Sequence, residues 1–240
     1  MRRTLYVFAR GTGQDGIKVM IMRKFFLPFW LVLGLLAGTA HSANAPAAFK
    51  EGINYIPVVP AQPTSVPPGQ IQVVEFFWYG CPRCFELQPY LEAWDRNKPA
   101  NVVLKRVPAA LNPQWDIAAR AYYTAMQLGI LAKANEAIYQ ALQVNHMNLA
   151  TATDYENFFA SRFDVNAKQF ETVWNSFEVD ARISQAKVLA QRYGITDVPT
   201  LAVNGKWLTG SGYRLSNAQI MDAVNWLVQR EQTALTGGTQ

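Results

Sequence analysis

Cysteine and histidine are scarce in this chain, which has two of each among its 240 residues. His41 lies in an N-terminal segment that we expect to be removed, so His146 is the remaining histidine of the mature chain. A metal site needs several such ligands, and a cysteine protease needs a base beside its nucleophile. The sequence favours neither, so we expect no bound metal and interpret His146 as an ordinary helix residue.

The chain also lacks a surplus of charge beyond its N-terminal segment. Its net charge is +5, and residues 1–42 hold six basic side chains against Asp15 alone. Residues 43–240 carry 16 basic and 16 acidic side chains and are therefore neutral. Because binding to phosphates depends on a basic surface, this composition does not favour nucleic-acid binding.

Residues 1–42 are predicted to be an N-terminal extension and a cleaved signal peptide. A short basic start is followed by the apolar run Phe25–Ala40 and then by small residues. This order is typical of a secretory signal peptide, and the small side chains favour cleavage near Ser42. A membrane anchor is the alternative, but the run is short for a bilayer span and contains a proline and a glycine.

The rest of the chain is hydrophobic enough for one core-forming domain that carries an insertion. Residues 43–70 are spaced by prolines, which predicts an extended arm with at most a short edge strand at Ile53–Val59. Residues 71–112 have the pattern of a βαβ unit, the first half of an α/β domain. Its parts are a strand buried on both faces (Ile71–Trp78), a helix that ends near Arg96 and a second strand (Val102–Val107).

Residues 113–190 are predicted to form a helical insertion, because apolar residues recur there with helical spacing. Thr153 and Asn166 are candidate N-caps of its later helices. Residues 191–240 then complete the α/β domain. Their predicted parts are a hairpin of Thr200–Val203 and Lys206–Thr209 around a type I′ turn at Asn204-Gly205, and a closing helix capped by Ser216.

Cys81 and Cys84 stand where the first predicted helix begins, close enough to form a disulfide. Pro82 suits the first helical position. The helix N-terminus favours a thiolate at Cys81, and the permanent cation of Arg83 adds to this effect. A stabilised thiolate makes the disulfide an oxidant of other thiols, with Cys84 as the resolving cysteine. An inert structural disulfide is the alternative, but so short a loop stabilises little.

Two segments around the insertion resemble the thioredoxin superfamily and, within it, the DsbA family of disulfide oxidases. Phe76 to Phe85 resembles the active-site segment of that family, and Tyr193 to Thr200 resembles its cis-proline loop. The helical insertion between the two segments is also a feature of this family. The resemblance implies an α/β, thioredoxin-like fold with a central mixed β-sheet and an inserted all-helical domain.

The resemblance also assigns roles in substrate binding. Pro199 is expected to be cis and to lie against the disulfide, while Val198 offers backbone hydrogen bonds to a bound peptide. The alternative for Pro199 is a trans proline at the start of an edge strand. Trp78 and Tyr79 are expected to flank a shallow apolar surface for unfolded chains, with a place in the core as their alternative.

Besides Pro82, three residues are expected to tune the cysteines. Glu75 and Lys105 align with an acid and a lysine that family members bury near the cysteine pair, although each also suits an outward-facing strand position. The sequence does not specify whether the two meet. Arg83 stands where the best-known members carry histidine, and its charge is expected to persist at high pH. The redox potential is therefore left open.

These features predict a monomeric periplasmic thiol:disulfide oxidoreductase with no cofactor beyond the Cys81–Cys84 disulfide. It is expected to donate this disulfide to reduced, unfolded exported proteins. The resemblance implies reoxidation by a membrane quinone-linked partner of the DsbB type. One alternative is an isomerase or reductase, although such isomerases carry a separate N-terminal dimerisation domain. Another is a thioredoxin-like peptide-binding chaperone whose cysteines are incidental.

Overall fold

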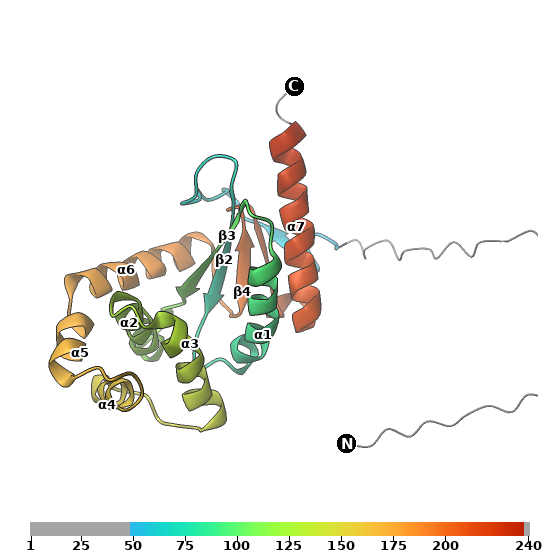
Figure 1. The fold of residues 1–240 in the computed structure, drawn as a ribbon. Coiled ribbons are helices and arrows are strands. Elements are labelled where there is room, and N and C mark those ends of the chain that lie inside the picture. Colours follow the sequence, from blue (N-terminus) through green and yellow to red (C-terminus); the bar gives the residue numbers. More distant parts are fainter. Residues whose placement is uncertain (1–48, 238–240) are drawn as a thin grey trace, which may run out of the picture. The chain divides into compact units, whose positions relative to one another are not determined.

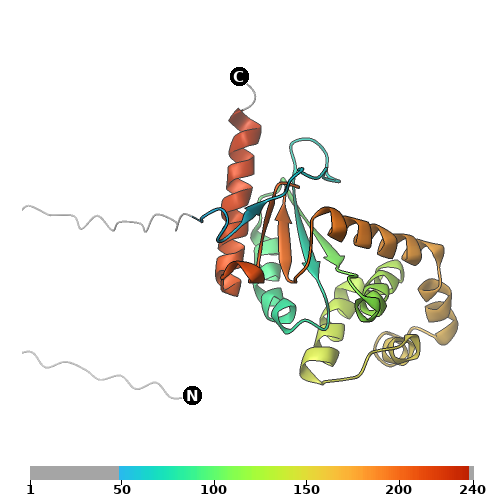
Figure 2. The same cartoon turned by 180° about the vertical axis from the view of Figure 1, so that it is seen from behind.

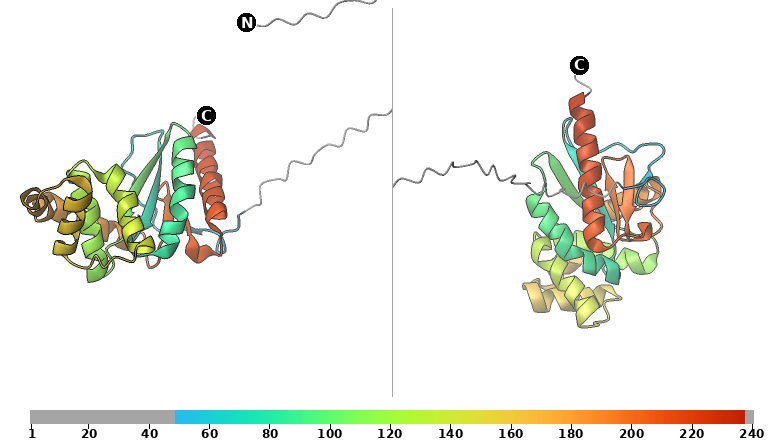
Figure 3. Two further views of the ribbon diagram at one scale, coloured as in Figure 1. Left: turned by 60° about the horizontal axis from the view of Figure 1, so that its bottom comes forward. Right: turned by 90° about the vertical axis from the view of Figure 1, so that its right-hand side faces the viewer.

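A five-stranded sheet lies at the centre of the computed structural model, which describes residues 49–237 (Figure 1). Helices α1 (Pro82–Asn97) and α7 (Asn217–Gly237) cover one face, and the helices from the middle of the chain lie on the other side (Figures 1 and 3). No helix between residues 49 and 237 is long and apolar enough to cross a bilayer. The signal peptide and cleavage site predicted for residues 1–42 lie outside the described residues.

The sheet is mixed, as predicted, and its strand order is β1-β5-β4-β2-β3. Strand β2 pairs with β3 in parallel and with β4 antiparallel, while β5 pairs antiparallel with β4 and β1. All seven residues of β2 are buried because helices lie on both sides of it. The strands are β1 (Ile56–Pro57), β2 (Ile71–Phe77), β3 (Val102–Pro108), β4 (Thr200–Val203) and β5 (Trp207–Gly210).

Two hydrophobic cores flank this sheet. One lies between the sheet and helices α1 and α7, and it contains the inward-facing residues of α7. These residues are Ile220, Val224, Leu227 and Val228. The other core joins the opposite face of the sheet to the helical insertion and includes many aromatic side chains. The start of α1, where both cysteines stand, contributes to this second core.

The insertion consists of helices α2 to α6 and a π-helical turn, η1. Their bounds are α2 (Pro113–Gln127), α3 (Leu131–Tyr139), η1 (Gln140–Val144), α4 (Ala152–Phe163), α5 (Ala167–Trp174) and α6 (Phe177–Arg192). The predicted cap at Asn166 is confirmed, whereas the one at Thr153 is wrong. Thr151 caps α4 instead, because it forms a reciprocal capping box with Asp154. The predicted domain limits stay a prediction.

His146 is not the helix residue that we expected. It lies in the loop after η1, is exposed, and has a positive φ of 50°. Within residues 49–237, no group of three or more His, Cys, Asp or Glu side chains lies close enough to hold a metal ion.

The β4–β5 hairpin has the predicted turn, since Asn204 and Gly205 both have positive φ, at 51° and 71°. Strand β5 starts one residue later than predicted, at Trp207, because the N–H of Lys206 closes the turn on the carbonyl of Val203 (3.0 Å). Ser216 caps α7 as predicted, accepting a hydrogen bond from the N–H of Gln219 (3.3 Å).

The N-terminal arm follows the β5 edge of the sheet, as Figure 2 shows from behind. Its strand β1 has two residues, fewer than predicted, because the chain before it turns on hydrogen bonds to the carbonyl of Lys50. The arm continues past β1 with Val58 N–H bonded to Lys206 and Gln62 N–H bonded to Gly205. β1 is therefore an edge strand, where its proline costs no hydrogen bond within the sheet.

Candidate active site

Cys81 and Cys84 are free thiols at the start of α1, and Cys81 is the N-cap of this helix. Its backbone is extended, and Pro82 follows at the first helical position, as predicted. The N–H of Cys84 donates to the sulfur of Cys81 over 3.2 Å. One of the N–H groups that a helix start leaves without a partner is thus satisfied by a sulfur atom. Such a contact favours negative charge on that sulfur.

The two cysteines differ in access to solvent. Cys84 is fully buried, whereas 8% of Cys81 is exposed. The thiol of Cys81 donates to the carbonyl oxygen of Val198 over 3.4 Å. The peptide bond between Val198 and Pro199 is cis, which confirms that prediction and makes the trans alternative wrong. The outer sulfur therefore lies against the cis-proline loop, although the two segments are more than a hundred residues apart in the sequence.

The same arrangement separates the acidities of the two thiols. The hydrogen bond with the Cys84 side chain holds the pKa of Cys81 below its usual value, and the N–H groups of Cys84 and Arg83 act in the same direction. Burial and the carboxylate of Asp197 oppose this shift. Burial, followed by the contact with Cys81, raises the pKa of Cys84 far above that of a free thiol. Negative charge on the pair therefore belongs to the outer sulfur.

The low pKa of Cys81 leads to a direct expectation about the reduced protein. Its ultraviolet thiolate absorbance should appear at a lower pH than that of an unperturbed cysteine. Because the folded-state pKa is lowered, the stability that Cys81 contributes to the dithiol form should be lost as the pH falls through that pKa. Cys81→Ser is the control and should lack the low-pH step. A first thiolate appearing at or above the usual cysteine pKa would contradict the prediction.

Arg83 lies at the predicted place, and its side chain is exposed. It donates to the carbonyl oxygen of Ser211 over 3.3 Å, in the short 3-10 turn η2 (Ser211–Tyr213) that follows β5. The Arg83 contribution to the pKa of Cys81 comes through its backbone N–H. The predicted effect of the guanidinium charge stays a prediction.

Glu75 is fully buried in the middle of β2, behind Cys84. Its Oε1 accepts a hydrogen bond from Nε2 of Gln88 (2.9 Å), which also donates to the carbonyl oxygen of Cys84 (3.2 Å). Its Oε2 lies 3.4 Å from Nε of Arg106. Burial raises the pKa of Glu75 to about 7, although Arg106 and Gln88 both lower it. Glu75 thus holds a proton into the neutral pH range, next to the backbone of the inner cysteine.

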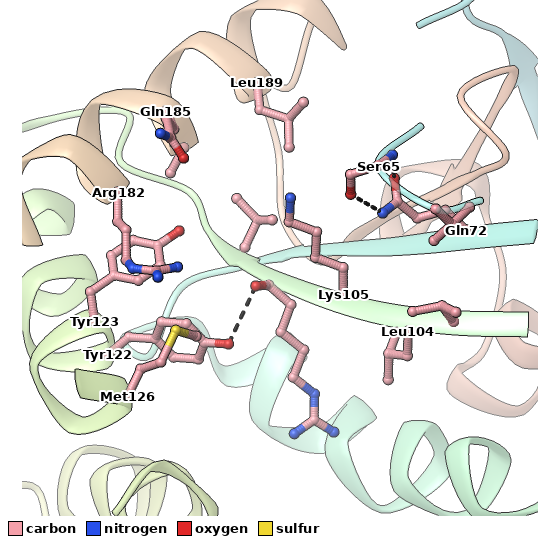
Figure 4. A pocket seen from close by; sticks show the side chains of 15 residues that line it. Ser65, Gln72, Leu104, Lys105, Tyr122, Tyr123, Met126, Arg182, Gln185 and Leu189 are labelled. Atoms are coloured by element: carbon pink, nitrogen blue, oxygen red, sulfur yellow. Dashed lines mark hydrogen bonds between the residues drawn. The ribbon is translucent and has the colours of Figure 1, made fainter. Parts of the chain in front are cut away.

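The expectation that Lys105 lies buried near the cysteines is wrong. In the parallel pairing of β2 with β3, Arg106 stands opposite Glu75, and Lys105 stands opposite Val74. Neighbouring residues of a strand point to opposite faces, so Lys105 points away from α1. It is exposed and lines a pocket on the far face with Arg182 and Leu189 (Figure 4). Arg106 takes the place expected for Lys105.

Trp78 and Tyr79 are neighbours with different surroundings. Trp78 is half-buried and stacks on Trp115 of α2, with ring centroids 4.7 Å apart. A Cβ at Gly80 would lie 2.2 Å from the Trp78 ring, so only glycine fits there. Tyr79 is buried, and its hydroxyl donates to Asn135 of α3 over 2.9 Å. The substrate-facing role expected for the Tyr79 side chain is therefore wrong, and sequence reasoning missed Trp115.

The thioredoxin-like sheet, the cysteine pair at the start of α1 and the cis-proline loop opposite it define a class of proteins. It is the class of thiol:disulfide oxidoreductases. A family model described as "DSBA-like thioredoxin domain" matches residues 101–221. This match covers the insertion and the cis-proline loop and begins after the cysteine pair.

Curated relatives extend the similarity over the cysteine segment. The thiol:disulfide interchange protein DsbA of Burkholderia cepacia is 36% identical over 211 residues, which are 88% of this chain and 98% of that protein. The protein of the same name from Pseudomonas aeruginosa is 32% identical over 213 residues, covering 89% and 99%. The chain therefore belongs to the DsbA family and is an oxidoreductase of the thiol:disulfide interchange type, as the resemblance implied.

Solved structures agree with this assignment. The crystal structure of Pseudomonas aeruginosa DsbA matches with a TM-score of 0.74 at 31% identity, covering 78% of this chain and 97% of that one. The oxidoreductase DsbA from Xylella fastidiosa matches with a TM-score of 0.68 at 27% identity, covering 75% and 96%. The predicted fold, a thioredoxin-like domain with a helical insertion, is confirmed.

Proposed function

We propose that this protein is an exported disulfide oxidase that transfers a Cys81–Cys84 disulfide to reduced proteins in the periplasm. The observation that carries this proposal is the contrast between the two sulfurs. Cys81 is 8% exposed and has a lowered pKa, while Cys84 is fully buried and has a raised one. A stabilised thiolate favours the dithiol form, so the disulfide readily oxidises other thiols.

The transfer takes two exchange steps. A substrate thiolate attacks Cys81, the sulfur–sulfur bond to Cys84 breaks, and Cys84 leaves and takes up a proton. A second substrate thiolate then attacks the substrate sulfur of the mixed disulfide and releases Cys81 as a thiolate. The substrate gains a disulfide, and the enzyme gains two electrons. The low pKa of Cys81 favours the second step because a stable thiolate leaves more readily.

Two neighbours of the pair have assigned roles in this proposal. Glu75, with its pKa raised to about 7, tunes the inner cysteine by holding a proton close to its backbone. Val198 and Pro199 hold the substrate: an extended chain pairs with the backbone of Val198, whose carbonyl oxygen lies against Cys81. The stacked Trp78 and Trp115 add an apolar surface at the start of the insertion.

The partners and the compartment follow from the same proposal. Substrates are reduced, unfolded exported proteins, and a membrane quinone-linked enzyme restores the disulfide. The basic and apolar N-terminal pattern supports export, and membership in the DsbA family supports the periplasm. The protein acts as a monomer, with the cysteine pair as its redox group.

Equilibration with glutathione tests the direction of transfer. We expect the reduced fraction, followed by thiolate absorbance, to yield a potential well above that of thioredoxin, about −270 mV. The oxidised protein should also form disulfides in a reduced, unfolded test protein. A potential as low as that of thioredoxin would indicate a reductase. Rearrangement of scrambled disulfides without net oxidation would indicate an isomerase.

A further inference from the structure

Asp197 stands directly before the cis-proline pair, in the loop between α6 and β4. Its Oδ1 accepts a hydrogen bond from the backbone N–H of Val198 over 2.9 Å. Its carbonyl oxygen accepts one from the hydroxyl of Thr200 over 2.7 Å, which fixes the loop. The residue itself is exposed. The N–H of Val198 is therefore bonded to a carboxylate oxygen, while the carbonyl oxygen of Val198 contacts Cys81.

The rest of the Asp197 carboxylate faces the η2 turn. A Cβ at Gly212 would lie 3.6 Å from its Oδ2. Burial, followed by the charge of Asp197, raises the pKa of Tyr213. The same charge also opposes the thiolate of Cys81. Within the described residues, Asp197 makes no ion pair, and the guanidinium of Arg83 donates to Ser211. Asp197 is thus an uncompensated negative charge beside the reactive sulfur.

A bound substrate changes the surroundings of this carboxylate. An extended chain that pairs with Val198 needs its N–H, so a substrate carbonyl must replace Oδ1 there. The released carboxylate then lies beside the bound chain and beside a sulfur that becomes a thiolate in the reaction. A positive substrate side chain near the reacting cysteine lowers the repulsion between these two negative groups, whereas a negative one increases it.

We propose that Asp197 is a specificity-determining residue that exchanges its hydrogen bond with Val198 for the substrate backbone and favours cysteines flanked by lysine or arginine. This proposal rests on the proposed function, since it concerns the chain that the cysteine pair oxidises. Two variants separate the two parts of the role. Asp197→Asn keeps an oxygen for the Val198 N–H and removes the charge, while Asp197→Ala removes both.

The test uses three peptides, each with two reduced cysteines, that differ at one residue beside the first cysteine: lysine, glutamine or glutamate. For the wild type at low salt, we expect kcat/KM for the lysine peptide to exceed that for the glutamate peptide about fivefold, and the preference should shrink at high salt. Asp197→Asn should treat the peptides alike and should show a lower Cys81 pKa by thiolate absorbance. Asp197→Ala should also lower KM for all three peptides.

Glu171→Gln, in exposed α5, makes the same change of charge away from the site and should keep the wild-type order. Equal rates for the three wild-type peptides, or an unchanged order in Asp197→Asn, would overturn the proposal. The peptide order of Asp197→Asn alone decides whether the proposal stands, so the test holds even if Asp197→Ala does not fold. A wild type that oxidises none of the peptides would instead overturn the proposed function, so the two failures are distinguishable.

Discussion

Replacing Cys81 by serine is expected to remove all oxidation of a reduced test protein. The buried Cys84 has no exposed surface and a strongly raised pKa, so it cannot substitute for the outer sulfur. A serine hydroxyl also cannot form the mixed disulfide through which the electrons pass. We expect the rate to fall at least about a thousandfold, to that of the uncatalysed control. The measurement is the loss of free thiols in the test protein over time.

Cys84→Ser is the matched variant, because it also removes one sulfur. It should oxidise nothing either, but its Cys81 should attack oxidised glutathione and keep one glutathione as a stable mixed disulfide. Without Cys84, the protein has no internal thiol that displaces this glutathione from Cys81. Mass spectrometry should therefore find the adduct on Cys84→Ser and none on Cys81→Ser. The reverse pattern would show that Cys84 is the sulfur that meets substrates, against the burial seen in the structure.

Glu75→Gln is expected to change how stability depends on pH. The pKa of Glu75 is raised to about 7 in the folded state, mainly by burial, from the ordinary glutamate value of 4.5. A proton is therefore held more tightly by the folded chain, and stability falls as the pH rises through this range. Between about pH 5 and about pH 8, ionisation of Glu75 should cost ~2–3 kcal/mol of the free energy of unfolding. The glutamine variant should lose this decline.

Urea unfolding at about pH 5 and at about pH 8 measures this difference in the free energy of unfolding. Cys81→Ser combined with Cys84→Ser is the suitable background, because it removes the titration of the thiols. Glu86→Gln is the matched control, since Glu86 is an exposed glutamate of helix α1, and it should keep the wild-type slope. An equal decline in Glu75→Gln and its parent would mean that Glu75 is already ionised at low pH in the folded protein.

Much of the site could be predicted because its signals are local. Cys81, Pro82 and Cys84 specify a capped helix start within four residues. The structure has the capping hydrogen bond there, from the N–H of Cys84 to the sulfur of Cys81. The Asn204-Gly205 turn is equally local, since both residues accept positive φ. The cis bond before Pro199 came from a resemblance over eight residues, and the structure confirmed it.

The errors share a different origin. Lys105 and Arg106 are adjacent and both basic, so a register difference of one residue exchanges the half-buried partner of Glu75 for an exposed side chain. Tyr79 follows Trp78 in an aromatic run, and only the insertion decides that one packs on Asn135 and the other stacks on Trp115. The only signal in the sequence for the contact of Trp115 with Trp78 was the position of Trp115 in the first turn of a helix next to the sheet.

The sequence by itself determined the chemistry of this protein: a disulfide-forming pair at a helix start, a partner loop that resembles that of a known family, and no net charge over residues 43–240. These properties depend on residues a few positions apart, whose backbone geometry is set by their own side chains. The tertiary structure decided which side chains meet around the pair. Glu75 and Arg106 come from neighbouring strands, and Val198 comes from the loop before β4. Their contacts with each other and with the cysteines depend on strand register and on which faces the helices cover.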